Sequence, residues 1–171
     1  EIRIGLDLDG VVYDWCSAVN ETVASCLDME AAVAGEHQSW GHIDETVLEY
    51  FEGDTAKAGD FFKWLWTDYE GLFGMFEDPS FIYPGGDRFM QDLAELGHLV
   101  IITSRPKLAA SFTLGFLAHY QVNAPEVYIV GSGKAKSSID CDVYIDDRDK
   151  NVEDILQNQL TYTKVLVPRR P

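Results

Sequence analysis

The sequence predicts an α/β fold of three layers, Rossmann-like, with a mostly parallel sheet between helices. Short apolar runs alternate with helical patterns from residue 83 onward, as strands and helices do around a parallel sheet. A strand at residues 2–6 is followed by a long region with helical patterns and no convincing strand. We therefore expect an α/β core of residues 1–12 and 83–171, with a small helical cap, residues 13–82, inserted after the first strand.

Each expected strand is a short β-branched and apolar run that ends near a polar residue or a glycine. The expected strands are residues 2–6, 99–102, 126–130, 143–145 and 164–167. The helices expected in the core are residues 87–96, ended by Gly97, a helix from Pro106 to about Tyr120, and residues 149–157.

The inserted region carries three helical patterns. They cover residues 13–27, a helix capped by Asp44 that runs to about Phe51, and residues 57–69. Residues 35–42 and 71–81 are expected to be loops or short turns. The region is crowded with aromatic residues, namely Trp40, Phe61, Phe62, Trp64, Trp66, Phe73 and Phe81.

The composition limits the partners of the chain. A net charge of −16 disfavours binding to a nucleic acid polymer, and solubility is the simplest reason for it. No apolar run approaches the roughly 18 residues that span a membrane, and we see no signal peptide. The three cysteines match no zinc pattern, so a reduced, cytoplasmic setting is expected. We expect a small-molecule partner; the oligomeric state stays open, with a homodimer among the alternatives.

Polar residues or glycines follow four of the expected strands. They are Asp7, Thr103, Gly131 and the pair Asp146-Asp147. Ligands of an open parallel sheet bind in the crevice at the carboxyl ends of the strands. These residues should therefore converge in space, although they are far apart in the sequence.

The chemistry of these side chains points to a metal and a phosphate. Asp7, Asp146 and Asp147 would repel one another when buried, so the cluster calls for a cation, and hard oxygen ligands favour Mg²⁺. Thr103 and a lysine would hold the phosphate oxygens. Asp7 could attack phosphorus, while Asp9 could protonate the leaving oxygen and later activate water.

Four segments resemble the motifs of the haloacid dehalogenase-like superfamily, in order and in spacing, across almost the whole core. The segments are Asp7-Leu8-Asp9-Gly10, Ile101-Ile102-Thr103-Ser104, Lys136 and Tyr144-Ile145-Asp146-Asp147. The resemblance implies a phosphatase that works through a phospho-aspartyl intermediate, with Asp7 as nucleophile and Asp9 as general acid and base. It implies phosphate binding by Thr103, Ser104 and Lys136, and Mg²⁺ binding by Asp7, Asp9, Asp146 and Asp147.

Within this superfamily the chain is most similar to the 5′(3′)-deoxyribonucleotidases. The similar segments are Tyr83-Pro84-Gly85, Thr103-Ser104, the Lys136-to-Asp146 spacing, and Asp146-Asp147-Arg148 with Asp149 and Asn151. That family uses Mg²⁺, carries a small helical cap, and releases phosphate from deoxynucleoside monophosphates. The resemblance implies the same substrate class here.

Several alternatives stay open at this level. Lys134 competes with Lys136 for the phosphate, and the sequence does not show which of Asp146 and Asp147 binds the metal directly. Arg148 could contact substrate or pair with a carboxylate, and Arg105 receives no role. The cap aromatics form a core or cover a nucleobase; the candidates for contact with a base are Trp64, Trp66 and Phe73. Two other functions remain: a phosphatase for another small ester, such as a sugar phosphate, or a non-catalytic binding protein.

Overall fold

The chain forms two compact units, residues 1–14 with 82–171, and residues 15–81. The structure is a computed structural model that describes residues 1–29, 40–68, 70–124, 126–131, 135–159 and 163–168. The first unit contains every strand found in these residues, and the second contains helices and 3₁₀ turns.

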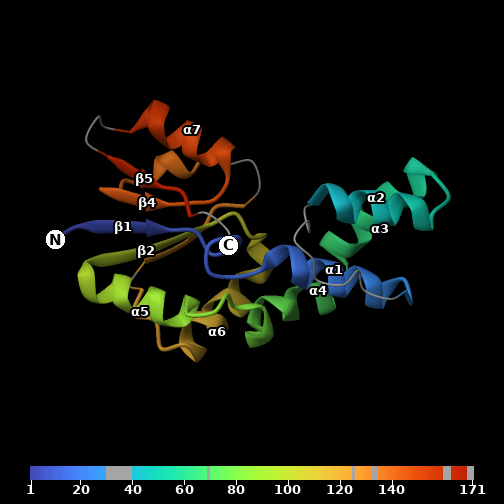
Figure 1. The fold of residues 1–171 in the computed structure, drawn as a ribbon, viewed down its shortest axis with the longest axis horizontal. Helices are drawn as coiled ribbons and strands as arrows, with labels where there is room; N and C mark the ends of the chain where they lie inside the picture. The colour runs from blue at the N-terminus through green and yellow to red at the C-terminus, as the bar shows by residue number, and fades with distance from the viewer. Residues whose placement is uncertain (30–39, 69, 125, 132–134, 160–162, 169–171) are drawn as a thin grey trace. The chain divides into compact units, whose positions relative to one another are not determined.

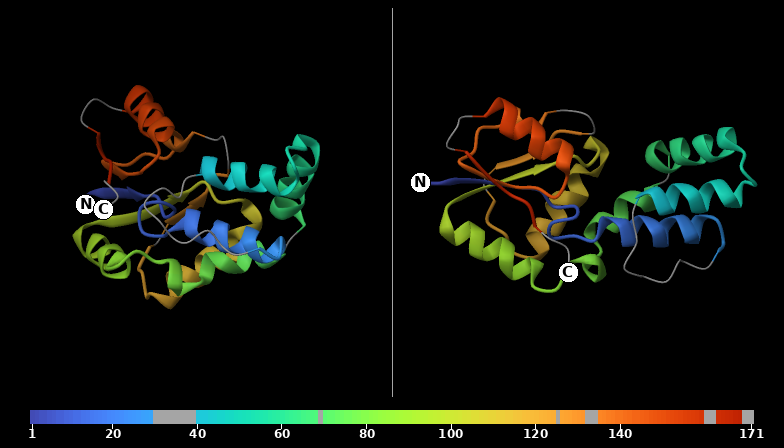
Figure 2. Two further views of the ribbon diagram at one scale, coloured as in Figure 1. Left: turned by 45° about the vertical axis from the view of Figure 1, so that its right-hand side comes forward. Right: turned by 45° about the horizontal axis from the view of Figure 1, so that its top comes forward.

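The first unit is built on a five-stranded sheet, in which every neighbouring pair of strands is parallel. The strands are β1 (Arg3–Leu6), β2 (His98–Thr103), β3 (Glu126–Ile129), β4 (Val143–Ile145) and β5 (Lys164–Leu166). Helices α5 (Gly86–Leu96) and α6 (Ala110–His119) lie on one face of the sheet and α7 (Asp149–Asn158) lies on the other (Figure 1). Figure 2 shows the same separation of α5 from α7 in two further views. The predicted three-layer fold with a parallel sheet is confirmed.

The strand order, β3-β2-β1-β4-β5, changes direction at β1. The chain builds outward from β1 to β2 and β3, and then returns to the other side of β1 to add β4 and β5. Such a reversal is the topological switch point at which open α/β sheets bind ligands. In this sheet it brings the carboxyl ends of β1 and β4 together, with Leu6 paired to Ile145.

The inner strands are buried on both faces, which explains their nearly continuous apolar sequence. Leu6, Val100 and Ile101 are fully buried. Gly97, at the end of α5, has an extended backbone, and a Cβ placed there would lie 2.4 Å from the carbonyl oxygen of Ile2. Glycine is therefore needed at this position for the close approach of two backbones as well as for ending the helix.

The second unit consists of short helices with a common apolar core. They are α1 (Trp15–Cys26), α2 (Trp40–Tyr50), α3 (Thr55–Thr67) and α4 (Glu70–Gly74), followed by 3₁₀ turns at Met75–Glu77 and Pro79–Phe81. Its most buried side chains include Val19, Val47, Leu65, Leu72 and Phe76, each with no exposed surface. None of the helices within the described residues is long and apolar enough to cross a membrane.

The helix start predicted at Asp44 is wrong, and so is the loop expected at residues 40–42; residues 35–39 of that loop lie outside the described residues. Asp44 does not begin a helix, because α2 already starts at Trp40 and Asp44 is exposed within it. Ile43 and Val47 lie one turn apart and are buried, so packing of this face carries the helix past the residue with the best capping side chain. Residues 71–81, expected as loop or short turns, include most of α4 besides two 3₁₀ turns. The cap that the sequence did not identify is Asp54, whose side chain accepts hydrogen bonds from the backbone N–H groups of Ala56 and Lys57.

The amino ends of three strands are joined by one carboxylate. Glu126 on β3 accepts hydrogen bonds from Arg3 Nη1 on β1 at 2.6 Å and from the Tyr128 hydroxyl at 2.6 Å, and its Oε1 lies 2.7 Å from Nε2 of His98 on β2. The hydrogen bond from Arg3, followed by those from Tyr128 and His98, lowers the pKa of Glu126 from 4.5 to about 2. The ionised form of Glu126 therefore favours the folded state.

We expect Glu126→Gln to lower the thermal unfolding midpoint at pH 7. Because the pKa of Glu126 is depressed to about 2 in the folded protein, its contribution is complete above the unfolded value near 4.5 and is lost as the pH falls through 2. Melting curves recorded from pH 7 down to pH 2 should thus converge for the variant and the wild type. Glu95→Gln removes the same charge from an exposed position on α5 and is the control. A Glu126→Gln deficit that stays constant down to pH 2 would contradict this account.

Candidate active site

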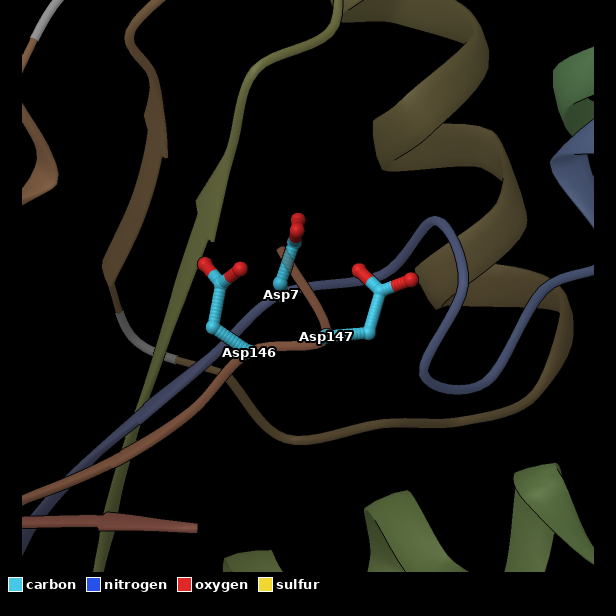
Figure 3. A group of neighbouring side chains, drawn as sticks. All are labelled: Asp7, Asp146 and Asp147. Carbon is cyan, nitrogen blue, oxygen red and sulfur yellow. The ribbon is translucent and has the colours of Figure 1, made fainter. Parts of the chain in front are cut away.

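Three carboxylates meet where β1 and β4 end. Asp7 follows β1 and donates its backbone N–H to the carbonyl of Ile145 at 2.9 Å, while Asp146 directly follows β4. Oxygen atoms of Asp7, Asp146 and Asp147 all lie within 4.8 Å of one another. Figure 3 shows these three side chains pointing to the same side of the backbone that carries them. Two of the four strand ends that the sequence predicted to converge, those of β1 and β4, lie side by side.

Lys136 lies between two of these carboxylates. Its Nζ is 2.8 Å from Oδ2 of Asp7 and 2.7 Å from Oδ2 of Asp146, and the side chain is almost fully buried. The 3₁₀ turn Lys136–Ser138 is held to α7, because the backbone N–H of Ser137 donates to Asp154 Oδ2 at 3.2 Å. The structure therefore brings Lys136 to the predicted site, whereas Lys134 lies outside the described residues.

The electrostatics of the group favour a further cation. Burial raises the pKa of Asp7 to about 7, with the negative charges of Asp146 and Asp9 adding to it and Lys136 opposing it. Burial alone would lower the pKa of Lys136, but Asp7 and Asp146 raise it above its ordinary value. With every group ionised, three carboxylates and one ammonium carry a formal charge of −3 + 1 = −2. An all-oxygen set with this excess charge fits a divalent cation such as Mg²⁺.

Asp146 is held by donors from the start of α7. Asn151 Nδ2 donates to Oδ1 and Oδ2 of Asp146 at 3.0 and 3.2 Å, and the backbone N–H of Arg148 donates to Oδ1 at 3.0 Å. Lys136 Nζ also donates to Oδ2 of Asp146. The orientation of this carboxylate is thus fixed on both oxygens. Asn151 entered the sequence analysis only as part of a family resemblance, and its position in the first turn of the helix after the two aspartates is the signal that could have identified it.

Gly10 gives Asp147 the space it occupies. Gly10 has φ +83°, and a Cβ built on it would lie 2.1 Å from Oδ2 of Asp147. The chain folds back here, because Gly10 N–H donates to the carbonyl of Tyr13 at 2.8 Å and Val12 N–H donates to that of Leu8 at 2.9 Å. The Asp9-Gly10 pair therefore forms a turn, and the missing Cβ of its glycine leaves space for the Asp147 carboxylate.

Asp9 has a partner that the sequence did not reveal. Arg105 Nη2 lies 2.7 Å from Oδ1 of Asp9, and Arg105 Nε lies 3.0 Å from each of the two Asp9 oxygens. The Asp9 side chain is 19% exposed, while that of Arg105 is fully buried. Among the described residues, the Asp9 carboxylate does not belong to the group formed by Asp7, Asp146 and Asp147. Nothing in the sequence around Arg105 indicates that its side chain would bond to Asp9, which is 96 positions away.

The other predicted residues differ in their placement. Thr103 ends β2, is fully buried, and accepts a hydrogen bond from the backbone N–H of Arg105 at 3.2 Å. Ser104 follows it and is partly buried, while the Arg148 side chain is exposed. Trp64 and Trp66 lie on α3 in the second unit, and the side chain of Phe73 lies outside the described residues.

The aromatic residues of the second unit pack mainly against one another. Trp66 stacks on Trp15 with ring centroids 6.0 Å apart and an angle of 12° between the planes. Phe61 contacts both Phe62 and Trp64, at 5.7 and 5.8 Å. Trp64 nevertheless keeps 40% of its surface exposed. These rings contact one another, but none of them is fully buried, and Trp64 is partly accessible to a ligand.

Comparisons with solved structures find the same fold in hydrolases of the haloacid dehalogenase-like superfamily. A Burkholderia xenovorans protein described as a haloacid dehalogenase-like hydrolase is 14% identical, with a TM-score of 0.62 over 100% of this chain and 83% of its own. A Geobacter sulfurreducens hydrolase of the superfamily is 12% identical, with a TM-score of 0.60 over 96% of this chain and 91% of its own. A magnesium-bound hydrolase of the superfamily from Bacillus subtilis is 12% identical, with a TM-score of 0.58 over 96% of this chain and 93% of its own.

The sequence itself identifies the family. The profile of the family described as 5′ nucleotidase, deoxy (pyrimidine), cytosolic type C protein matches residues 1–165. No curated protein matches the chain. The chain belongs to this nucleotidase family and is an enzyme of the phosphatase class, which confirms the resemblance seen in the four motifs.

We expect Gly10→Ala to weaken the binding of a divalent cation by about tenfold or more, because the added methyl group displaces the Asp147 carboxylate. Isothermal titration with Mg²⁺ measures this directly. Gly59→Ala is the matched control, since nothing lies within 4 Å of a Cβ at that position. Unchanged Mg²⁺ affinity in a folded Gly10→Ala variant would show that cation binding does not depend on the space that Gly10 leaves for Asp147.

Proposed function

We propose that this chain is a Mg²⁺-dependent phosphomonoesterase that dephosphorylates (deoxy)nucleoside monophosphates through a phospho-aspartyl intermediate on Asp7. The observation that carries the proposal is the buried Asp7 carboxylate, which lies 2.8 Å from Lys136 Nζ at the switch point of the sheet. A carboxylate in this position is a nucleophile only where nearby positive charge offsets the repulsion from a phosphate dianion, and Lys136 supplies part of that charge.

The reaction would proceed in two displacements. In the first, an oxygen of Asp7 forms a bond to phosphorus as the bond to the ester oxygen breaks, and Asp9 gives its proton to the leaving oxygen. In the second, Asp9 accepts a proton from water as the water oxygen attacks phosphorus, which releases phosphate and regenerates Asp7. The residues that would hold the transferred phosphoryl group are Thr103, Ser104 and Lys136.

Mg²⁺ would be held by Asp7, Asp146 and Asp147, where its charge offsets that of the phosphoryl oxygens. Asp146 is the better oriented of the two aspartates from the fourth motif, because Asn151, Arg148 N–H and Lys136 fix both of its oxygens. The contribution of Asp9 to the metal stays a prediction, since its carboxylate is bonded to Arg105. This part of the proposal follows from the donor set and the family, and the charge balance supports it.

We further propose that the helical region, residues 13–82, acts as the cap that selects the substrate. Its partly exposed Trp64 is a better candidate for stacking on a base than Trp66, whose ring is already stacked on Trp15. Arg148, with its exposed side chain at the start of α7, is the candidate for a further polar contact with the substrate. Deoxynucleoside monophosphates are the substrates that the family membership favours.

Asp7→Asn should abolish the release of phosphate, by at least about a thousandfold in kcat, and leave the fold intact, because the amide is not a nucleophile. Steady-state hydrolysis of each deoxy- and ribonucleoside monophosphate, with Mg²⁺ and with a chelator, is the assay. Asp140→Asn, an exposed aspartate of the same unit, is the matched control and should retain activity. Normal turnover by a folded Asp7→Asn variant would exclude the covalent route, and nucleotides ranking last among phosphomonoesters would exclude the substrate class.

Trp64→Ala should lower kcat/KM for deoxynucleoside monophosphates by roughly tenfold, within the range that one base stacked on an aromatic contributes. The same variant should leave kcat/KM for deoxyribose 5-phosphate unchanged, because that ester has no base. Tyr50→Ala, which removes another exposed aromatic ring of the second unit, is the control. An equal loss for both esters would mean that Trp64 supports the structure of the unit and contacts no base.

A further inference from the structure

Arg105 is the least expected residue near the reaction centre, because a complete charged side chain is buried beside the residue proposed for proton transfer. Its guanidinium contacts both carboxylate oxygens of Asp9, at 2.7 Å from Nη2 to Oδ1 and 3.0 Å from Nε to each oxygen. Two donors spread over two acceptors fix the plane of a carboxylate as well as its distance. The Asp9 side chain is therefore held in a single orientation.

The guanidinium is itself fixed on its other sides. Nη1 donates to the hydroxyl of Thr113 on α6 at 3.3 Å. Its central carbon lies 5.1 Å from the centre of the Tyr13 ring and 5.7 Å from that of Phe116, and these two rings meet edge to face. Thr113, Tyr13 and Phe116 are all fully buried. Arg105 therefore connects Asp9 to α6 and to two buried aromatic rings.

The burial of this ion pair is not needed for packing alone. Burying an ion pair is often no more stabilising than filling the same volume with apolar side chains, and a buried charge without its partner is strongly destabilising. A site that needed only packing around Tyr13 and Phe116 could be filled without a charge. What the arginine adds is a defined orientation of the Asp9 carboxylate, and proton transfer depends on that orientation.

We propose that Arg105 is a positioning residue that holds Asp9 in the orientation required for proton transfer to the leaving oxygen and from water. The inference rests on the role proposed for Asp9 above and extends it to a residue outside the four motifs. Arg105 also donates its backbone N–H to the Thr103 hydroxyl at 3.2 Å. One residue thus anchors both the proton-transfer group and the threonine proposed to bind phosphate.

A double-mutant cycle tests the proposal. Arg105→Ala should lower kcat by about 10- to 100-fold, as expected for a misplaced reacting group, while KM stays within about twofold. Asp9→Asn should lower kcat further, and Arg105→Ala made in the Asp9→Asn background should cause no additional loss, because Arg105 acts through Asp9. Guanidinium ion, added below the concentration that unfolds the protein, should restore part of kcat to Arg105→Ala and none to Asp9→Asn.

The controls separate positioning from folding. Arg88→Ala removes an exposed arginine from α5 and should leave kcat and KM unchanged. Circular dichroism and thermal melting report whether each variant is folded. If Arg105→Ala does not fold, Arg105→Lys and Thr113→Val replace it in the same cycle. Each should lower kcat in the wild-type background and cause no further loss in the Asp9→Asn background.

Two results have different meanings. A wild-type protein that hydrolyses no phosphomonoester would overturn the proposed function and the inference with it. An active wild type, an inactive Asp9→Asn and a folded Arg105→Ala with full kcat would overturn the inference alone. Losses that add independently in the cycle would also overturn it, because they would show that Arg105 does not act through Asp9.

Discussion

The contact of the Lys136 ammonium with the Asp7 and Asp146 carboxylates is the interaction on which the rest of the site depends. Carboxylates that follow adjacent strands of a buried sheet repel one another, and burial alone disfavours their ionised forms. Lys136 Nζ, at 2.8 and 2.7 Å from the two side chains, offsets this repulsion while it is itself kept charged by them. Asp7 and Asp146 can both be ionised at the edge of the sheet because each of them contacts the positive charge of Lys136.

The fold supplies the positions, and local contacts supply the orientations. A parallel sheet whose order reverses at β1 brings Asp7 and Asp146 together from strands separated by most of the chain. Asn151 and the backbone of Arg148 then fix Asp146, the missing Cβ of Gly10 admits Asp147, and Arg105 fixes Asp9.

The sequence predicted the features that depend on periodicity and on the alternation of strands with helices. Apolar runs ending in Asp7, Thr103 and Asp146 were enough to place the sheet and its ligand-binding edge, because parallel strands bring their carboxyl ends to one side. It failed where packing between distant segments decides the outcome. The start of α2 follows from the burial of Ile43 rather than from the capping preference of Asp44. The bonds of Arg105 to Asp9 depend on a side chain that reaches across the unit, which no local pattern reports.

The central claim is that the substrate phosphorus becomes bonded to Asp7, and rapid-quench mass spectrometry tests it most directly. The wild-type enzyme is mixed with a deoxynucleoside monophosphate and Mg²⁺, stopped with acid within the first turnover, and digested. We expect a phosphoryl adduct that forms before steady state and maps to Asp7 in the peptide that contains β1. A burst of nucleoside with no adduct on Asp7, or an adduct on another residue such as Ser104, would contradict the account.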